Sequence, residues 1–319
     1  MDGKCSNPDC PAPISCHDGH DNHTECPNWL KNNMIKTRDP KETSRKRPKS
    51  SQVWTGDVLK VDDVNQISYR NTPIVIGLAG KAKAGKTTFL SMLYTLLLNG
   101  ERFSNFGFAG TKTIIGWDNL YNTLKVKENK VSLPEPTPTN YLRLLHFALR
   151  NNEDQLKDIL LTDASGEVFT NWSQNKDAVN AKNAQWIYDI SNGFIFFIDC
   201  DDLIARKNSA KTEIIDIAEM LNNDLKERPV IAVWSKADLK ADVHPKIKES
   251  LQKELQEIFS NYTEIDISNF PSKNPDEIVH KNNLKVIDWL LASIILPSKK
   301  DIEISNYYEN DIFLNYKGK

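Results

Sequence analysis

Residues 73–88 read Pro73-Ile-Val-Ile-Gly-Leu-Ala-Gly80-Lys-Ala-Lys-Ala-Gly85-Lys86-Thr87-Thr88. A short apolar run leads into the pattern G-x-x-x-x-G-K-T, and an apolar, helix-like segment follows as far as Asn99-Gly100, a pair typical of a helix C-terminus. A buried strand, a glycine-rich loop and a helix in this order form the Walker A loop, which cradles phosphate groups. The sequence therefore predicts a nucleotide-binding α/β protein.

Each fixed position of this pattern has a physical role in holding phosphate. Gly80 and Gly85 let the backbone turn its N–H groups inward, Lys86 supplies an ammonium for the outer phosphates, and Thr87 offers a hydroxyl to Mg²⁺. The following helix adds its positive N-terminal end. The loop residues predicted to bind nucleotide are Gly80, Ala84, Gly85, Lys86, Thr87 and Thr88.

The composition is that of an ordinary globular protein. The 319 residues are 39% hydrophobic and 26% charged, with a net charge of −2, so no overall attraction to nucleic acid or anionic lipid is expected. The longest apolar runs are much shorter than the roughly 20 residues that a membrane helix needs, and the N-terminus lacks a signal-peptide core. We therefore expect a soluble, cytoplasmic protein without a membrane span.

Between Pro73 and Pro297 short β-branched and aromatic runs alternate with longer helical patterns, which is typical of a parallel sheet covered by helices. We expect an α/β P-loop NTPase fold with a doubly wound, mostly parallel sheet and one antiparallel hairpin strand. The hairpin is predicted at 141–149 and 157–162, and further strands at 193–199, 230–234 and 263–267. Helices are expected at 117–124, 177–190, 210–226, 245–259 and 284–295.

Four segments are expected along the chain. They are a Cys/His-rich module at 1–35, a basic linker at 36–72, the P-loop domain at 73–297 and a C-terminal tail at 298–319. The basic run 36–49 is interpreted as a solvated linker, with a phosphate-binding arm as the alternative. The apolar residues of the tail could pack on the domain or dock to a partner, and the irregular stretch 101–140 has the length of a functional loop.

Two further motifs follow predicted strands. Asp163-Ala-Ser-Gly166 ends the strand at 159–162, so Asp163 can reach Mg²⁺ and the Gly166 N–H can contact a terminal phosphate. Ser235-Lys236-Ala-Asp238 ends the strand at 230–234. The two carboxylate oxygens of Asp238 match the ring N–H and the exocyclic amine of guanine, and Lys236 can lay its aliphatic stem along the base.

With these three motifs in this order, the chain resembles a GTPase of the translation-factor-related (TRAFAC) class. It is more similar still to the bacterial double-GTPase (DO-GTPase) domains, through the stretches 108–117, 144–150 and 163–172, and the resemblance covers about 74–296. It implies a GTP-dependent switch in a bacterial defence or conflict system. It also places Ser268 in the base-facing loop.

Four positions depart from that pattern or leave alternatives. Ser235 stands where most such GTPases carry asparagine or threonine, which predicts weaker bracing of the base loop. Glu167 stands where Ras-like enzymes have a water-orienting glutamine, so it is either a base or a switch-loop charge. Thr111 and Thr113 are both candidates for the first-switch hydroxyl, with Thr113 slightly preferred.

Lys81 and Lys83 lie inside the Walker loop. Either ammonium could neutralise charge that develops on the phosphates, as an arginine finger does, and Lys81 also coincides with the lysine of the deviant loop in MinD-like ATPases. The alternative is a solvated side chain that points away from the loop. If either lysine points inward, hydrolysis would not require an external activator.

The N-terminus carries the pattern Cys5-x4-Cys10-x5-Cys16-His17-Asp-Gly-His20-Asp-Asn-His23-x2-Cys26. Four soft ligands at such short spacings can complete a tetrahedral zinc site, and so short a segment has too little core to fold unaided. The predicted ligands are Cys5, Cys10, Cys16 and Cys26, with His20 as an alternate. An unstructured tail with reduced thiols is the competing interpretation.

These features predict a GTP-binding protein that hydrolyses GTP to GDP and phosphate with Mg²⁺ and acts on a protein partner. Its catalytic candidates are Lys86, Thr113, Glu167, Lys81 and Lys83. The alternatives are a nucleotide-dependent interaction module that scarcely hydrolyses GTP and, ranked lower, a zinc-module nucleic-acid binder. The sequence does not indicate an oligomeric state.

Overall fold

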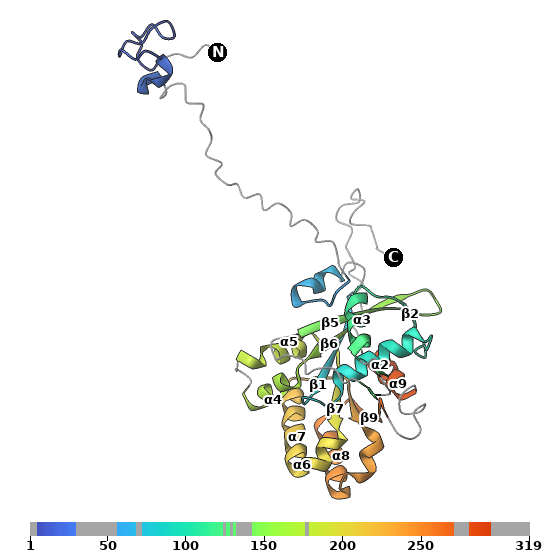
Figure 1. Cartoon of the computed structure of the whole chain (residues 1–319). Coiled ribbons are helices and arrows are strands. Elements are labelled where there is room, and N and C mark those ends of the chain that lie inside the picture. The colour runs from blue at the N-terminus through green and yellow to red at the C-terminus, as the bar shows by residue number, and fades with distance from the viewer. Residues whose placement is uncertain are drawn as a thin grey trace, which may run out of the picture. The chain divides into compact units, whose positions relative to one another are not determined.

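The computed structural model describes residues 5–29, 56–67, 72–123, 126–127, 130–131, 142–175, 179–270 and 281–294. The chain divides into two compact units, residues 1–53 and 54–319, which are considered separately. Figure 1 shows the second unit as a sheet covered by helices. The basic run 36–49, the loop 132–141 and the tail 298–319 lie outside the described residues.

The second unit contains a seven-stranded sheet. Its spatial order is β2 (Gly107–Gly110), β5 (Leu142–Arg150), β6 (Leu156–Ala164), β1 (Ile74–Gly80), β7 (Gly193–Asp199), β8 (Val230–Ser235) and β9 (Tyr262–Asp266). Only β5 among these seven runs against its neighbours, pairing antiparallel with both β2 and β6. This confirms the predicted, mostly parallel sheet with one antiparallel hairpin strand.

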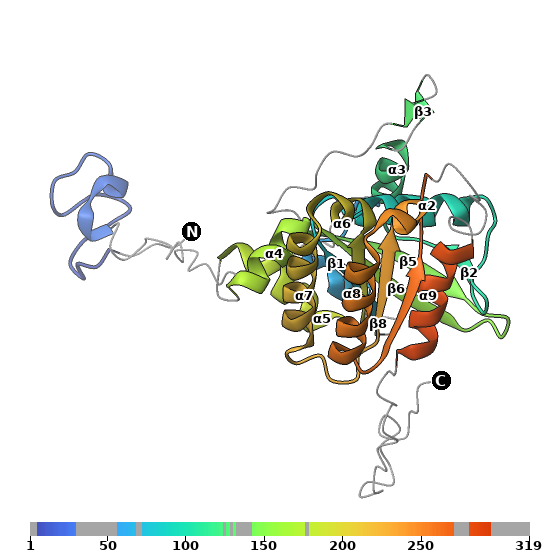
Figure 2. The same cartoon turned by 90° about the horizontal axis from the view of Figure 1, so that it is seen from below.

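Helices cover both faces of the sheet because its central strands are apolar on both sides. The core on one face joins Ile74, Ile76 and Leu78 to α2 (Lys86–Leu98), α3 (Ile114–Thr123) and α9 (Asn282–Ser293). The core on the other face joins the alternate positions of β7 and β8 to α4 (Gly166–Gln174), α5 (Lys182–Ile190), α7 (Asn208–Asn222) and α8 (Pro245–Ile258). Figure 2 shows α7 and α8 on the opposite side of the sheet from α9.

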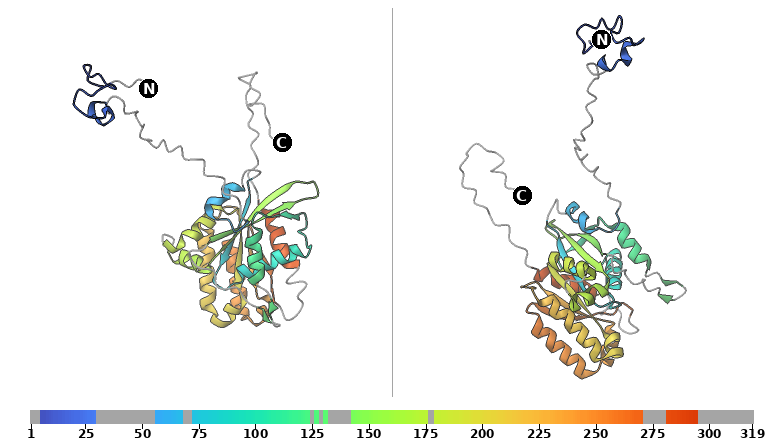
Figure 3. Two further views of the ribbon diagram at one scale, coloured as in Figure 1. Left: turned by 45° about the horizontal axis from the view of Figure 1, so that its top comes forward. Right: turned by 90° about the vertical axis from the view of Figure 1, so that its left-hand side faces the viewer.

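The remaining elements are short. They are α6 (Cys200–Arg206), a two-stranded sheet formed by β3 (Val126–Lys127) and β4 (Lys130–Val131), and the 3-10 helices η1 (His23–Glu25), η2 (Val61–Gln66), η3 (Val179–Ala181) and η4 (Ala237–Asp242). The β5–β6 hairpin, yellow-green in Figure 3, lies within the sheet, between β2 and β1. No helix in the described ranges has the length and apolar character required to cross a membrane.

Several boundaries differ from the sequence-based expectation. The helix expected at 177–190 begins at Lys182, while α4 occupies 166–174, where the sequence predicts no helix. The Ser165 hydroxyl accepts a hydrogen bond from the Glu167 N–H and caps α4, whose buried residues Val168, Phe169 and Trp172 have helical spacing. Part of the predicted linker also belongs to the domain, because buried Leu59 exchanges backbone hydrogen bonds with Leu144 of β5.

Candidate nucleotide site

The Walker loop connects the end of β1 to the start of α2. Gly80 has a φ of +138° and an added Cβ would lie 2.9 Å from the Phe197 carbonyl oxygen, so a side chain cannot be accommodated there. Gly85 caps α2 with a φ of +86°, again in the region that favours glycine. The two glycines of the motif are therefore explained by the backbone path of the loop.

Lys86 is folded back over this loop. Its Nζ donates hydrogen bonds to the carbonyl oxygens of Gly80 at 2.8 Å and Lys81 at 2.7 Å. The side chain is buried, and the loss of hydration lowers the pKa of Lys86 to about 8, although the attraction of Asp163 partly opposes this change. The ammonium thus sits inside the loop that phosphate groups would enter.

Thr87 and Asp163 meet at the carboxyl edge of the sheet. Thr87, in the first turn of α2, donates a hydrogen bond from Oγ1 to Asp163 Oδ1 at 3.1 Å, and Asp163 is completely buried near the end of β6. A hydroxyl and a carboxylate oxygen at this separation are the type of ligands that Mg²⁺ prefers. The chemistry of these two residues therefore fits a magnesium ion.

Sequence reasoning missed Arg143, which binds the same carboxylate. Its Nε and Nη2 lie 2.6 and 2.5 Å from Asp163 Oδ2, because Arg143 of β5 is directly opposite Asp163 of β6 in the antiparallel pairing. The predicted hairpin contained the signal for this contact. An exact register for the turn at 151–155 would have placed the two residues side by side.

Gly166 presses against the Walker loop. A Cβ added to this glycine would lie 2.0 Å from the Ala82 nitrogen and 2.1 Å from the Lys81 carbonyl carbon. Both clashing groups are backbone, which cannot move aside as a flexible side chain could. The start of α4 and the phosphate-binding loop are thus in direct contact, as a loop that senses the terminal phosphate requires.

We predict that Gly166→Ala destabilises the fold by about 3 kcal/mol, since the added methyl group must displace backbone, and also weakens nucleotide binding. Urea unfolding and titration with a fluorescent GDP analogue measure the two effects. Gly100→Ala is the matched control: Gly100 has a φ of +87° but no atom within 4 Å of an added Cβ. It is expected to cost about 1 kcal/mol from backbone strain and to leave affinity unchanged. Equal affinities for the wild type and Gly166→Ala would refute the prediction.

The structure brings together the residues predicted to recognise the base. Ser268 is buried, and its hydroxyl donates a hydrogen bond to Asp238 Oδ1 at 2.5 Å, while the Asp238 side chain remains exposed. Ser235 is buried at the end of β8 and donates to the Ile198 carbonyl oxygen at 3.1 Å. A Cβ added to Gly85 would lie 3.7 Å from Ser235 Cβ, so the base loop and the Walker loop are adjacent.

Lys236 lies two residues before Asp238 in the chain and has a φ of +52°. Its Nζ donates hydrogen bonds to Asp199 Oδ2 at 2.8 Å and Asp201 Oδ2 at 3.3 Å. These two carboxylates hold the charged end of the side chain at the end of β7. These contacts engage the ammonium and not the aliphatic stem, and the contact of this stem with a base stays a prediction.

The structure does not direct the charge of Lys81 toward the loop interior, and it does not leave this lysine solvated. Lys81 Nζ forms ion pairs with Asp202 of α6, at 3.1 Å, and with Glu213 of α7, and the side chain is only 17% exposed. Lys83 is exposed, with a φ of +64°. The charge of Lys81 is thus paired with carboxylates far away in the sequence, and its catalytic role stays a prediction.

Thr111 and Thr113 are likewise held elsewhere. Thr113 is completely buried, and its hydroxyl accepts a hydrogen bond from the His146 backbone N–H at 2.9 Å. Thr111 Oγ1 donates to the His146 carbonyl oxygen. Since His146 pairs with Leu160, three residues before Asp163, both hydroxyls lie beside the middle of the hairpin. The role of Thr113 as the first-switch hydroxyl therefore stays a prediction.

Glu167 and the cysteine module remain predictions. Glu167 is exposed in the first turn of α4. In the N-terminal unit the His17 N–H donates to Cys10 Sγ at 3.4 Å, Cys26 is buried, and Cys5 and Cys16 are partly buried. Within the described residues, no group of three or more His, Cys, Asp or Glu side chains has the arrangement of a metal site. His20 is exposed.

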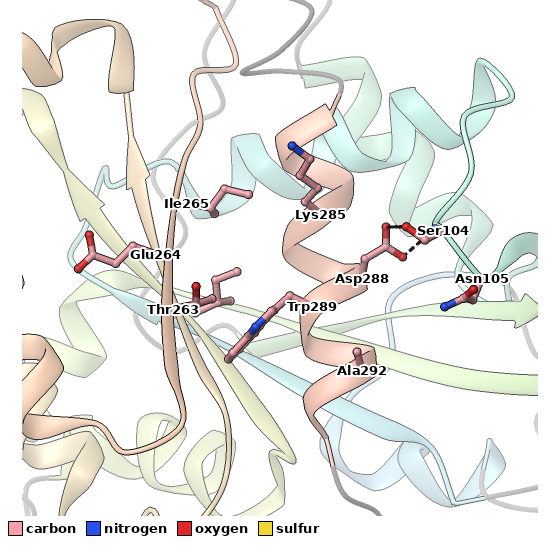
Figure 4. Close-up of a pocket in the computed structure, with 10 residues that line it drawn as sticks. Ser104, Asn105, Thr263, Glu264, Ile265, Lys285, Asp288, Trp289 and Ala292 are labelled. Atoms are coloured by element: carbon pink, nitrogen blue, oxygen red, sulfur yellow. Dashed lines mark hydrogen bonds between the residues drawn. The ribbon is translucent and has the colours of Figure 1, made fainter.

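A separate cleft of about 470 Å³ lies between β9 and α9. Figure 4 shows Ile265 and Trp289 along it, with Asp288 bonded to Ser104 at one side. The Ser104 backbone N–H and Oγ donate to the two carboxylate oxygens of Asp288, each at 2.8 Å. The described lining of this cleft includes no residue of the Walker loop, so the cleft is distinct from the nucleotide site.

A seven-stranded sheet with a Walker loop after β1, an aspartate ending the antiparallel hairpin and an aspartate following β8 defines a P-loop protein of the GTPase type. The family comparison agrees: residues 74–292 match the Double-GTPase 2 family, and the chain belongs to that family.

No match was found among curated proteins. Among solved structures, the chain is similar to a Plasmodium falciparum protein described as nucleolar GTP-binding protein 1. The two share 15% sequence identity with a TM-score of 0.37, over 67% of this chain and 88% of that protein. A likeness this weak carries no argument about activity.

Proposed function

We propose that this protein binds GTP together with Mg²⁺, hydrolyses it to GDP and phosphate, and uses the two nucleotide states as a switch for a protein partner. The observation that carries this proposal is the contact between Gly166 and the backbone of Lys81 and Ala82. A terminal phosphate bound in the Walker loop would lie beside the first turn of α4. Loss of that phosphate would then change the position of α4.

In this proposal each described side chain has one role. Lys86 exchanges its bonds to the Gly80 and Lys81 carbonyl oxygens for bonds to the phosphates, and the loop N–H groups hold the remaining phosphate oxygens. Thr87 and Asp163 would hold the metal ion, which neutralises charge on the phosphates. Asp238, oriented by Ser268, accepts the two guanine donors, and water attacks the terminal phosphate in line.

Single-turnover hydrolysis tests this function. Excess protein is mixed with γ-labelled GTP, and released phosphate is measured with Mg²⁺ and with a chelator. We expect release above the buffer rate that requires Mg²⁺ and is lost in Thr87→Ala. Lys83→Ala, at an exposed loop position, reports whether that ammonium contributes to the rate. Failure of the wild type to bind GTP would exclude the proposal altogether.

The alternative is an interaction module that binds GTP but scarcely hydrolyses it. It is favoured by the exposure of Glu167, whose carboxylate cannot donate a hydrogen bond to the phosphoryl group. Glu167→Gln separates the two cases. An increase in phosphate release would show that the wild-type residue limits hydrolysis, whereas a decrease would show that Glu167 acts as a base.

We further propose that Cys5, Cys10, Cys16 and Cys26 bind a structural zinc ion, with His20 as the alternate fourth ligand. The hydrogen bond from the His17 N–H to Cys10 Sγ supports this, because such bonds stabilise a thiolate ligand. Elemental analysis of the purified full-length protein, with Cys26→Ser as the comparison, tests it. Zinc absent from the wild type would exclude the site. The role in bacterial defence stays a prediction.

A further inference from the structure

Arg143 forms an ion pair with the Asp163 carboxylate, which is also a proposed ligand of the magnesium ion. Asp163 is completely buried, and both of its oxygens are engaged: the Thr87 hydroxyl donates to Oδ1, and the Arg143 guanidinium donates from Nε and Nη2 to Oδ2. Arg143 reaches this position from the neighbouring strand, with 17% of its side chain exposed. The contact is therefore fixed by the pairing of β5 with β6.

The charges around Asp163 oppose the entry of a further cation. A guanidinium remains protonated at any ordinary pH and offers only donors, so it cannot itself bind a metal ion. Lys86 is also close enough for its charge to be attracted to Asp163. One buried negative charge thus already faces two positive side chains, before a divalent ion arrives.

We propose that Arg143 is a positioning residue that competes with Mg²⁺ for Asp163. In the metal-free protein the guanidinium holds the carboxylate in place and compensates its buried charge. Asp163 and Thr87 would hold the Mg²⁺ that arrives with the nucleotide, and Asp163 would then be released from Arg143. The competition lowers the affinity of the site for Mg²⁺, so the metal is retained only with a bound nucleotide. This inference rests on the proposed GTP-binding function.

The affinity for Mg²⁺ can be measured without hydrolysis, through the release rate of a bound fluorescent GDP analogue (mant-GDP). Bound Mg²⁺ slows release, so a titration of free Mg²⁺ gives the midpoint for each variant. Arg143→Gln is expected to lower this midpoint roughly tenfold, because one charge next to a carboxylate changes its affinity for a second cation by at least that factor. Arg143→Lys, which cannot form the two-nitrogen contact, is expected to lower the midpoint less.

Arg150→Gln is the matched control. Arg150 lies on the same strand and is exposed, and its ion pair with the exposed side chain of Asp154 has a length of 3.6 Å. The Mg²⁺ midpoint of Arg150→Gln should therefore equal that of the wild type. A midpoint that is unchanged or higher in Arg143→Gln overturns the inference. If circular dichroism shows that Arg143→Gln is unfolded, an unchanged midpoint in Arg143→Lys overturns it instead. If the wild type does not bind mant-GDP, the proposed function is wrong and the inference falls with it.

Discussion

Asp238→Asn is expected to weaken GTP binding by about two orders of magnitude and to create binding of xanthosine triphosphate. The N1–H and the exocyclic amine of guanine are both donors, and the two oxygens of Asp238 accept both. An asparagine side chain presents one acceptor and one donor. The asparagine NH2 group would therefore face the guanine amine, and two donors cannot form a hydrogen bond. Xanthine has a carbonyl oxygen at that position, which accepts a hydrogen bond from the asparagine NH2 group.

Competition of GTP, ATP and xanthosine triphosphate against a labelled GTP analogue measures the change in base preference. Asp242→Asn is the matched control, because Asp242 is also exposed in η4 and has no assigned role at the base. Its affinities should equal those of the wild type. Ser268→Ala should weaken GTP binding less, since it removes only the hydrogen bond that orients Asp238. Unaltered GTP preference in Asp238→Asn would show that another part of the chain reads the base.

Much of this architecture can be predicted from the sequence because its signals are local. The apolar runs that became β7 and β8, and the glycines before Lys86, depend on residues a few positions apart. The helix α4 was missed although Val168, Phe169 and Trp172 have helical spacing. The Ser165 cap, which marks the start of this helix, lies within the Asp163-Ala-Ser-Gly166 motif, which the sequence analysis interprets only through its contacts with Mg²⁺ and phosphate.

The features that the sequence did not predict depend on contacts between distant segments. Lys81 is neutralised by Asp202 and Glu213, which come from helices more than a hundred residues later in the chain. The contact between Arg143 and Asp163 can be predicted only when the register of the hairpin is known to the residue. A slip by one position would put Arg143 on the other face of the sheet. Candidate cations near a phosphate site can be enumerated from sequence, but their actual partners require the fold.

Lys86→Met is expected to have opposite effects on nucleotide binding and on stability. Without the ammonium, affinity for GTP should fall at least about a hundredfold, because the phosphates lose a charged partner in a buried site. The nucleotide-free protein should nevertheless become more stable. Burial lowers the pKa of Lys86 from 10.5 to about 8, so keeping the side chain charged costs about 3 kcal/mol at neutral pH. The two carbonyl groups that lose their donor offset about 2 kcal/mol of this gain, about 1 kcal/mol for each hydrogen bond.

The dependence on pH distinguishes this explanation from a simple packing effect. Below pH 8 lysine is charged in both the folded and the unfolded protein, so the cost is fully present. As the pH rises from about 8 to 10.5, the folded protein gives up this proton first and the cost disappears. Urea unfolding without nucleotide should show a Lys86→Met protein that is more stable than the wild type at pH 7 and less stable near pH 10.5, where only the loss of the two hydrogen bonds remains. Lys246→Met, at an exposed position of α8, should match the wild type at both pH values. A Lys86→Met protein less stable than the wild type at pH 7 would mean that its two backbone hydrogen bonds outweigh the cost of burying the charge.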